Sequence, residues 1–152
     1  MTYFPAKKIM ENLWIGSQGD SEDAAFMKKH NIKLIINCSK DIPFSFPNIK
    51  GYRVPVHDSK SETDNIVAHW PVTCVAIDEV LRRGQGVLVH CRAGMQRSAA
   101  TVAAYIMYKC RVSAAVAMRK IKGLKTETFY PAPTFDKALA KWEAELQSRK
   151  NA

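Results

Sequence analysis

Short apolar runs and longer amphipathic stretches alternate along most of the chain. The β-branched runs at residues 32–38 and 87–89 predict two buried strands, and a shorter run at 13–15 predicts another. Residues 52–56 are also expected to be extended. Pro55 places them at a sheet edge or a strand end, because proline cannot donate to a ladder. Segments longer than the strands themselves separate these four strand candidates from one another.

Helical spacing fills those connections. Residues 99–110 are apolar on nearly all sides, which predicts a central, fully buried helix. Shorter helices are expected to begin at Asp20 and at Ser113, each acting as N-cap. Pro71 must either begin the main part of a long helix or kink it. That helix has one apolar stripe, formed by Ile66, Trp70, Cys74, Ile77 and Leu81.

Strands that alternate with helices and then give way to a run of helices predict an α/β fold, with a central sheet and helices on both faces. The length of 152 residues fits a single domain, residues 1–152, without linker or repeat. No apolar run approaches about 18 residues, so no membrane span is expected. Residues 1–10 lack the apolar core of a secretory signal.

The chain is basic, with a formal net charge of +9. Such a surface is either simply solvated or attracts phosphorylated and acidic proteins, anionic lipid or nucleic acid, and charge alone does not choose among these. The histidines show no metal-ligand spacing, so neither a metal nor another cofactor is expected. The cysteines form neither a metal pattern nor a disulfide framework, which is typical of a reducing intracellular compartment: Cys38, Cys74, Cys91 and Cys110.

The loop His90–Ser98 lies between the strand 87–89 and the buried helix. The first N–H groups of a helix lack intrahelical partners and its dipole favours negative charge, so this junction is suited to binding an anion. Cys91 begins the loop, where the same potential stabilises a nucleophilic thiolate. Arg97 offers a planar fork of donors to two phosphoryl oxygens, and Gly94 allows close backbone approach. The predicted phosphate-binding residues are Arg92, Ala93, Gly94, Met95, Gln96 and Arg97.

The run His-Cys-x-x-Gly-x-x-Arg-Ser resembles the signature of the cysteine-based protein phosphatases. With Ala104-Tyr105-Ile106-Met107 in the next helix, the chain looks like their small, atypical dual-specificity branch, over nearly its whole length. Two departures are visible. Gln96 stands where the family usually has Ser, and Pro131-Ala132-Pro133-Thr134-Phe135 stands where it has Pro-Asn-x-x-Phe. Neither departure removes a catalytic group.

The resemblance implies the compact, three-layer phosphatase fold, with a mostly parallel sheet of about four to five strands. It also implies hydrolysis of phosphotyrosine and phosphoserine or phosphothreonine in proteins, through a cysteinyl-phosphate intermediate and without a cofactor. Ser98 resembles the family hydroxyl that donates to the Cys91 sulfur, although it could also serve as the N-cap of the following helix. His90 is expected to support the loop as a structural donor.

The leaving group of such a reaction needs a proton, which a carboxylic acid opposite the loop can supply. Asp58 is the favoured candidate. It ends a strand, opens a polar loop, and precedes Cys91 at a distance similar to that in the family. Asp64 is the alternative, although its position favours a role in capping the next helix.

Cys38 ends the strand 32–38, which should run beside the strand leading to Cys91. Some relatives keep a second cysteine there that traps the oxidised nucleophile as a disulfide. Cys38 is therefore either a redox partner of Cys91 or a small buried apolar residue.

Other substrate classes stay open beside the favoured phosphorylated protein. The same chemistry could act on a phosphoinositide, another phospholipid headgroup or an RNA 5′ phosphate. Lipid-directed relatives often have extra Lys in the loop, where this chain has Arg92, and RNA-directed relatives commonly lack the acid. A non-catalytic phosphate-binding module is the third hypothesis. The presence of both Cys91 and Asp58 argues against it.

Overall fold

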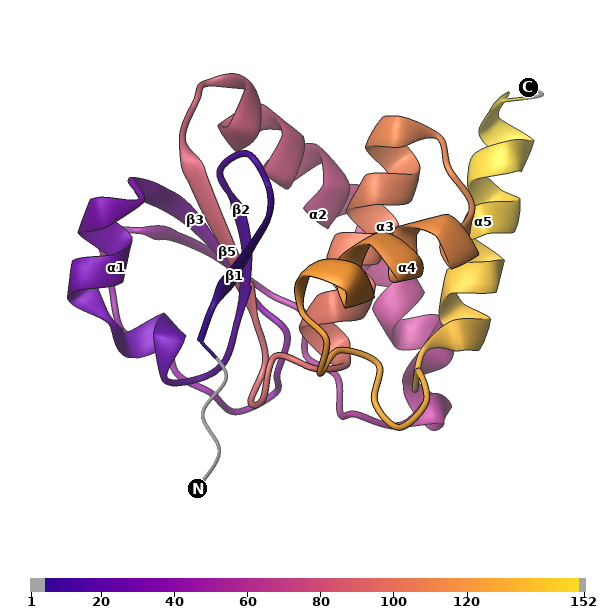
Figure 1. Cartoon of the computed structure of the whole chain (residues 1–152), viewed down its shortest axis with the longest axis horizontal. Coiled ribbons are helices and arrows are strands. Elements are labelled where there is room, and N and C mark those ends of the chain that lie inside the picture. Colours follow the sequence, from indigo (N-terminus) through magenta and orange to yellow (C-terminus); the bar gives the residue numbers. More distant parts are fainter. Residues whose placement is uncertain (1–4, 151–152) are drawn as a thin grey trace.

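The computed structural model describes residues 5–150 and has a five-stranded sheet in the order β1-β2-β5-β3-β4. All neighbouring strands are parallel except the antiparallel pair β1 and β2. Their bounds are β1 Lys7–Met10, β2 Leu13–Gly16, β3 Ile32–Asn37, β4 Lys50–Arg53 and β5 Gly86–His90 (Figure 1).

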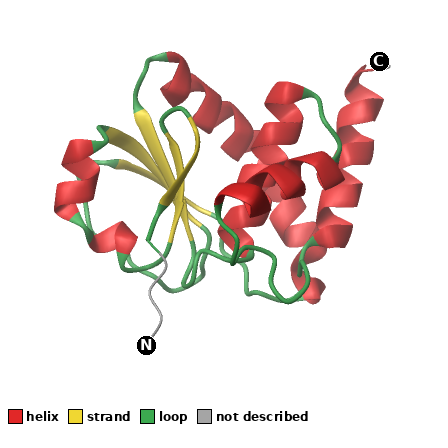
Figure 2. Cartoon of the chain, viewed as in Figure 1, coloured by secondary structure: helices red, strands yellow, loops and turns green. Residues whose placement is uncertain are grey.

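The sheet lies between two helical layers, as Figure 2 shows. The short helix α1 covers one face, and the long helices α2 to α5 cover the other. The helices are α1 Ala24–Lys29, α2 Thr63–Arg82, α3 Arg97–Cys110, α4 Ala114–Leu124 and α5 Asp136–Lys150, with 3₁₀ turns at Asp20–Glu22 and Lys60–Glu62. This is the three-layer α/β architecture that the sequence predicted.

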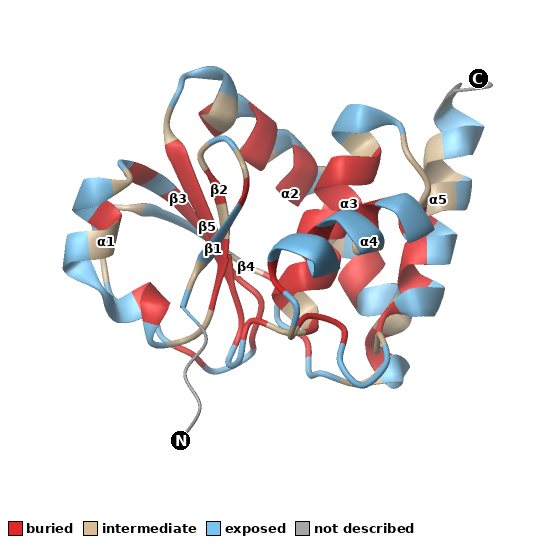
Figure 3. Cartoon of the chain, in the orientation of Figure 1, coloured by how far each residue is buried: buried red, intermediate tan, exposed pale blue. Residues whose placement is uncertain are grey.

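The main core lies between the sheet and α3. Residues Ser98–Met107 of α3 are all buried, which confirms the central helix predicted from its apolar composition. Figure 3 shows this burial on α3 and on the facing strands. A smaller apolar cluster under α1 contains Met27, Ile32, Ile35 and Leu88.

Strand β5 occupies the centre of the sheet and is buried throughout. It pairs in parallel with β3, with Asn37 opposite His90. The Cys38 N–H extends this pairing by donating to the His90 carbonyl at 2.7 Å. Because carboxyl ends of parallel strands share one edge of the sheet, the ends of β3 and β5 bring Cys38 and Cys91 to neighbouring positions.

Some local predictions were wrong. The sequence missed β1, in which only Ile9 is buried. Asp20 is not the N-cap of a helix. Its carboxylate instead accepts from the N–H and hydroxyl of Ser17, at 2.8 and 3.1 Å. The cap of α1 is Asp23, which accepts from the Phe26 N–H at 3.1 Å. Asp20 and Asp23 are close enough in sequence that either could have capped the helix. Asp20 is instead engaged by Ser17 in the turn after β2.

Two further predictions about helices can be settled. Ser113 caps α4 by accepting from the Val116 N–H at 3.2 Å, as predicted. Pro71 lies inside a helix that runs from Thr63 to Arg82, so it does not begin the helix. Among the described residues, no helix combines the length and apolar character needed to cross a bilayer.

Candidate active site

The loop between β5 and α3 packs tightly against the turn that follows β2. Gly94 has φ +74, and a Cβ at this position would lie 2.7 Å from the Gly16 carbonyl oxygen. Both features require glycine. The Gln18 N–H donates to the Arg92 carbonyl at 3.0 Å. Contacts between backbones therefore fix the shape of the loop.

Cys91 is only 3% exposed and lies against the first turn of α3. Its Sγ is 3.2 Å from the Ser98 Oγ. Gln96, and not Ser98, occupies the N-cap position, so the alternative of Ser98 as helix cap is wrong. Ser98 lies inside the first turn, where its hydroxyl can donate to a thiolate.

The Arg97 side chain joins this loop to the segment that contains Asp58. Its Nη1 donates to the Val56 carbonyl at 3.0 Å. The second cation of the loop, Arg92, is exposed and lies 3.7 Å from the Asp41 carboxylate. The two arginines thus differ, since only Arg97 lies in the first turn of α3, directly before Ser98, whose hydroxyl contacts the Cys91 Sγ.

His90 is buried beneath the loop, and its Nδ1 is 3.4 Å from the Cys91 carbonyl oxygen. A carbonyl only accepts, so Nδ1 must carry the proton in this contact. Burial lowers the pKa of His90 to about 4. A neutral imidazole in this position can hold the loop by donating to the Cys91 carbonyl, which is the structural role predicted for it.

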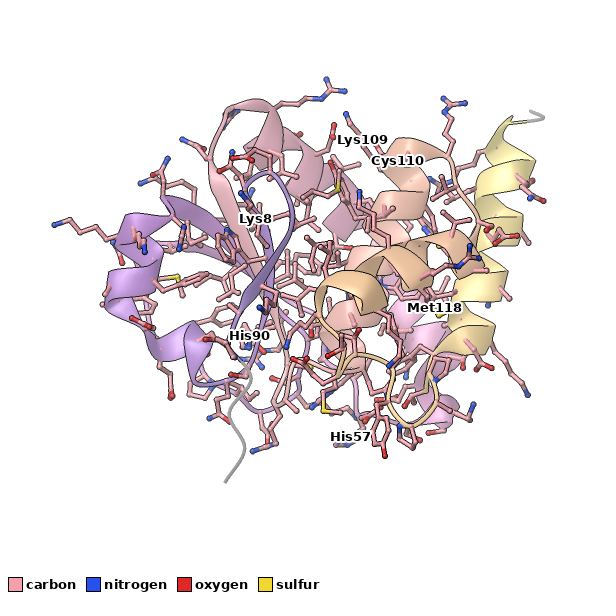
Figure 4. The ribbon with its side chains drawn as sticks, viewed as in Figure 1. Lys8, His57, His90, Lys109, Cys110 and Met118 are labelled. Atoms are coloured by element: carbon pink, nitrogen blue, oxygen red, sulfur yellow. The ribbon has the colours of Figure 1, made fainter. Side chains whose placement is uncertain are left out.

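Asp58 is exposed in the turn that follows Val56 and precedes the 3₁₀ turn at 60–62. Because the Val56 carbonyl is the acceptor for Arg97, this turn lies beside the phosphate loop. Figure 4 labels His57 and His90, which precede Asp58 and Cys91 in the sequence, and both histidines lie in the lower half of the view. The rival Asp64 lies in the first turn of α2 and pairs with Lys141 of α5 at 2.8 Å.

Cys38 is fully buried beside the loop. Its Sγ lies 3.5 Å from the hydroxyl of Thr101, which itself donates to the Arg97 carbonyl at 3.0 Å and accepts from Trp70 Nε1 at 3.2 Å. The thiol is therefore the donor. Burial raises the pKa of Cys38 to about 12, so this cysteine stays protonated. Within residues 5–150, no three His, Cys, Asp or Glu side chains are grouped as metal ligands.

Comparison with known proteins identifies the family. The family model described as "Dual specificity phosphatase, catalytic domain" matches residues 13–145. The chain belongs to this family. It is similar to dual specificity protein phosphatase 1B of Arabidopsis thaliana, with 31% identity covering 92% of this chain and 83% of that protein. Its identity to human dual specificity phosphatase 28 is also 31%, covering 95% of this chain and 81% of the relative.

A solved structure has the same architecture. The crystal structure of human DUSP28 superposes with a TM-score of 0.87 at 31% identity, covering 96% of this chain and 97% of that one. The protein is thus a cysteine-dependent dual specificity phosphatase, as the loop motif indicated.

Sequence reasoning missed one side chain that organises this phosphatase, and it missed the contacts of another. Glu62 is buried, and its Oε2 accepts from the His57 N–H at 2.7 Å. Glu62 falls within the polar loop predicted after Asp58, and no sequence signal marks it. The sequence predicts Gln96 as a phosphate-binding residue and as a departure from the family pattern, but it does not indicate the contacts that the Gln96 side chain makes.

Gln96 binds the segment that contains the second departure. Its Nε2 donates to the carbonyls of Tyr130 and Ala132, each at 3.1 Å, and its Oε1 accepts from the Thr134 N–H at 3.0 Å. The Phe129 N–H adds a bond to the Met95 carbonyl at 2.9 Å. The two departures from the family pattern, Gln96 and the segment 131–135, are therefore in contact. Together they fix the segment that packs beside the loop.

Proposed function

We propose that four side chains carry the reaction of this phosphatase on phosphorylated proteins: Cys91, Arg97, Asp58 and Ser98. The observation that carries the proposal is the 3.2 Å contact of Cys91 Sγ with Ser98 Oγ at the N-terminus of α3. A thiolate there lies in the positive field of the helix and receives a hydrogen bond. Arg97 begins the same helix and supplies the second cationic element of the site.

In the first step the Cys91 thiolate attacks the phosphorus of the phosphate ester. The S–P bond forms while the P–O bond to the leaving group breaks, and the leaving oxygen takes a proton from Asp58. Loop N–H groups and the Arg97 guanidinium stabilise the equatorial oxygens of the transferring phosphoryl group. The exposed position of Asp58 supports this role, because the leaving group departs toward the protein substrate on the solvent side.

In the second step water attacks the phosphorus of the cysteinyl phosphate. Asp58, now a carboxylate, takes a proton from this water, and the S–P bond breaks to release inorganic phosphate. The sulfur leaves as a thiolate. The Ser98 hydroxyl is placed to donate to it and to ease its departure.

A phosphoprotein is the substrate class best supported by the family. The contact of Arg92 with Asp41 at 3.7 Å partly balances the charge of the extra loop cation. A loop built for a polyanionic headgroup would gain from leaving that cation available. Because the thiolate must stay reduced to act, we also place the protein in a reducing intracellular compartment.

The test is a comparison of turnover on phosphotyrosine and phosphoserine or phosphothreonine peptides, a phosphoinositide, and a triphosphorylated RNA. We expect the highest kcat/KM on the phosphopeptides and none for Cys91→Ser on any substrate. A higher kcat/KM on the phosphoinositide or the RNA would overturn the assignment to proteins while leaving the chemistry intact.

A further inference from the structure

We propose that Glu62 is a positioning residue, which holds the turn bearing Asp58 so that the acid is in place before the substrate arrives. The inference rests on the proposed role of Asp58 as general acid. Glu62 does not need to touch the substrate. It acts through the backbone of the residue that precedes the acid.

The contacts of Glu62 single it out within the turn. Glu62 as a whole residue is only 7% exposed, although the turn around it is largely solvated. Its Oε2 accepts from the backbone N–H of His57 at 2.7 Å, and its Oε1 accepts from Asn65 Nδ2 at 2.8 Å. The Lys40 ammonium lies 3.7 Å away. The hydrogen bond from His57 is the main reason that the pKa of Glu62 is lowered, so the ionised carboxylate is the form that holds the turn.

A second tether acts on the preceding residue. Arg97 Nη1 donates to the Val56 carbonyl at 3.0 Å, so the carbonyl of Val56 and the N–H of His57 are held by two different side chains. The Ser59 N–H donates to the His57 carbonyl at 3.0 Å. Asp58 therefore lies between fixed backbone groups, and its position depends on them.

Positioning of this kind has a kinetic signature. A general acid works only within hydrogen-bond reach of the leaving oxygen, and a shift of about 1 Å can cost about 10²-fold in rate. His57 is an exposed residue, so without Glu62 water can replace the acceptor of its backbone N–H, but water does not fix the turn. The loss should then fall on substrates whose leaving group needs a proton, and spare those whose leaving group does not.

The experiment measures kcat/KM for a series of phosphate monoesters, from nitrophenyl phosphate to alkyl phosphates. This parameter reports formation of the cysteinyl phosphate. For Glu62→Ala we expect a loss of about tenfold or more on alkyl phosphates, and of less than about threefold on nitrophenyl phosphate. Glu62→Gln keeps one oxygen acceptor and should show a smaller loss of the same kind. It carries the same test if Glu62→Ala does not fold.

Glu143→Ala is the matched control. The Glu143 carboxylate also accepts a hydrogen bond from a backbone N–H, that of Ala114 at 2.6 Å. This contact lies at the start of α4 and not in the turn at residues 57–62 that contains Asp58, which we call the acid turn. We expect this variant to be less stable. Any fall in its kcat/KM should be the same for alkyl phosphates and nitrophenyl phosphate. An equal loss on all esters for Glu62→Ala, like that of a purely structural change, would overturn the proposal.

Asp58→Asn separates the two assignments. If Asp58→Asn shows the dependence on the leaving group and Glu62→Ala does not, the positioning role alone fails. If Asp58→Asn shows no such dependence, the acid is misassigned and both proposals fail. When both roles hold, the double variant should be no slower on alkyl phosphates than Asp58→Asn alone.

Discussion

The phosphate loop and the acid turn lie side by side in this phosphatase, but different kinds of contact hold them. Backbone groups fix the phosphate loop: the Gln18 N–H binds Arg92, the Phe129 N–H binds Met95, and Gly94 packs against Gly16. The acid turn is held mainly by side chains that reach it from other positions, Arg97 and Glu62. Cys91, the proposed nucleophile, is buried, whereas Asp58, the proposed acid, is exposed.

This difference has a chemical consequence. The phosphoryl group is the same in every substrate, so the part that binds it can be rigid and built into the fold. Leaving groups differ in size and basicity, and the acid turn, which is proposed to protonate them, is largely exposed to solvent. Damage to the phosphate loop should therefore affect all substrates equally, while damage to the acid turn should depend on the leaving group.

The largest effect is expected for Cys91→Ser, which should abolish turnover of every ester, because a serine hydroxyl in this site is not ionised. Binding of a phosphopeptide should survive, since backbone N–H groups and Arg97 remain. Calorimetry measures the binding, and release of inorganic phosphate measures turnover. Cys110→Ser, at an exposed position, is the control. Residual turnover by the Cys91 variant would contradict the assignment of the nucleophile.

Arg97→Lys tests the residue that belongs to both regions. An ammonium cannot replace the planar fork and cannot hold the Val56 carbonyl in the same geometry. We expect kcat/KM to fall by about 10³-fold on nitrophenyl phosphate, and by more on alkyl phosphates, because the tether to the turn that contains Asp58 is weakened as well. Arg119→Lys, exposed on α4, provides the control. Activity close to that of the unmodified protein would show that charge alone suffices at this position.

Asp58→Asn should sharpen the contrast between the two regions. We expect a loss of about 10²–10⁴ on alkyl phosphates and a much smaller one on nitrophenyl phosphate, which needs little protonation. Steady-state kinetics on both esters measures the difference. Asp64→Asn should have little effect, because Asp64 pairs with Lys141 on α5. A larger effect of Asp64→Asn would reassign the acid.

The two regions should also respond differently to pH in their stability. Because the pKa of His90 is lowered to about 4, the unfolded chain binds more protons than the folded one between pH 6.5 and about 4. The free energy of unfolding should fall over this window by up to about 3 kcal/mol from this group. The pKa of Glu62 is also lowered, but its stabilising effect is present above the ordinary value of 4.5 and is lost only below it.

Urea unfolding at pH 7 and pH 4.5 measures this difference. His90→Asn should reduce the fall in stability between the two pH values, whereas Glu62→Gln should leave it nearly unchanged. An unaltered fall in the His90 variant would mean that another group is responsible.

The smallest effect is expected for Cys38. Peroxide would oxidise the Cys91 thiolate to a sulfenic acid, and the Cys38 thiol would then displace water from it to form a disulfide, if the Cα atoms lie within about 7 Å. Because Cys38 stays protonated, with a pKa of about 12, this capture should be slow.

Mass spectrometry after mild peroxide treatment should find the Cys38–Cys91 linkage, and dithiothreitol should restore activity. Cys38→Ser should recover less activity than the unmodified protein after the same exposure. Equal recovery would rule out protection and leave Cys38 as a buried apolar residue.

The sequence predicted much of the fold where burial leaves a clear pattern. The runs at 32–38 and 87–89 are strands, and the apolar segment 99–110 lies in the central helix. The pattern failed where burial was slight, as in β1 with Ile9 alone buried, or where two similar groups competed, as with Asp20 and Asp23 at the start of α1.

The phosphate loop could be predicted because its functional groups are contiguous. A strand, a loop and the start of a helix bring Cys91, Gly94 and Arg97 together in one short segment, which is enough to predict an anion site there. Local sequence determined this half of the site, and with it the chemistry of the reaction.

Only the tertiary structure decided how that half is joined to its surroundings. Arg97 reaches Val56 across 41 positions, and Gln96 reaches the Thr134 backbone across 38. Even Glu62, only five positions from His57, gave no signal, because periodicity reports which side chains are buried and not which polar groups they meet. A hydrogen bond depends on distance and direction in space. Those are fixed only when the sheet and helices have packed together.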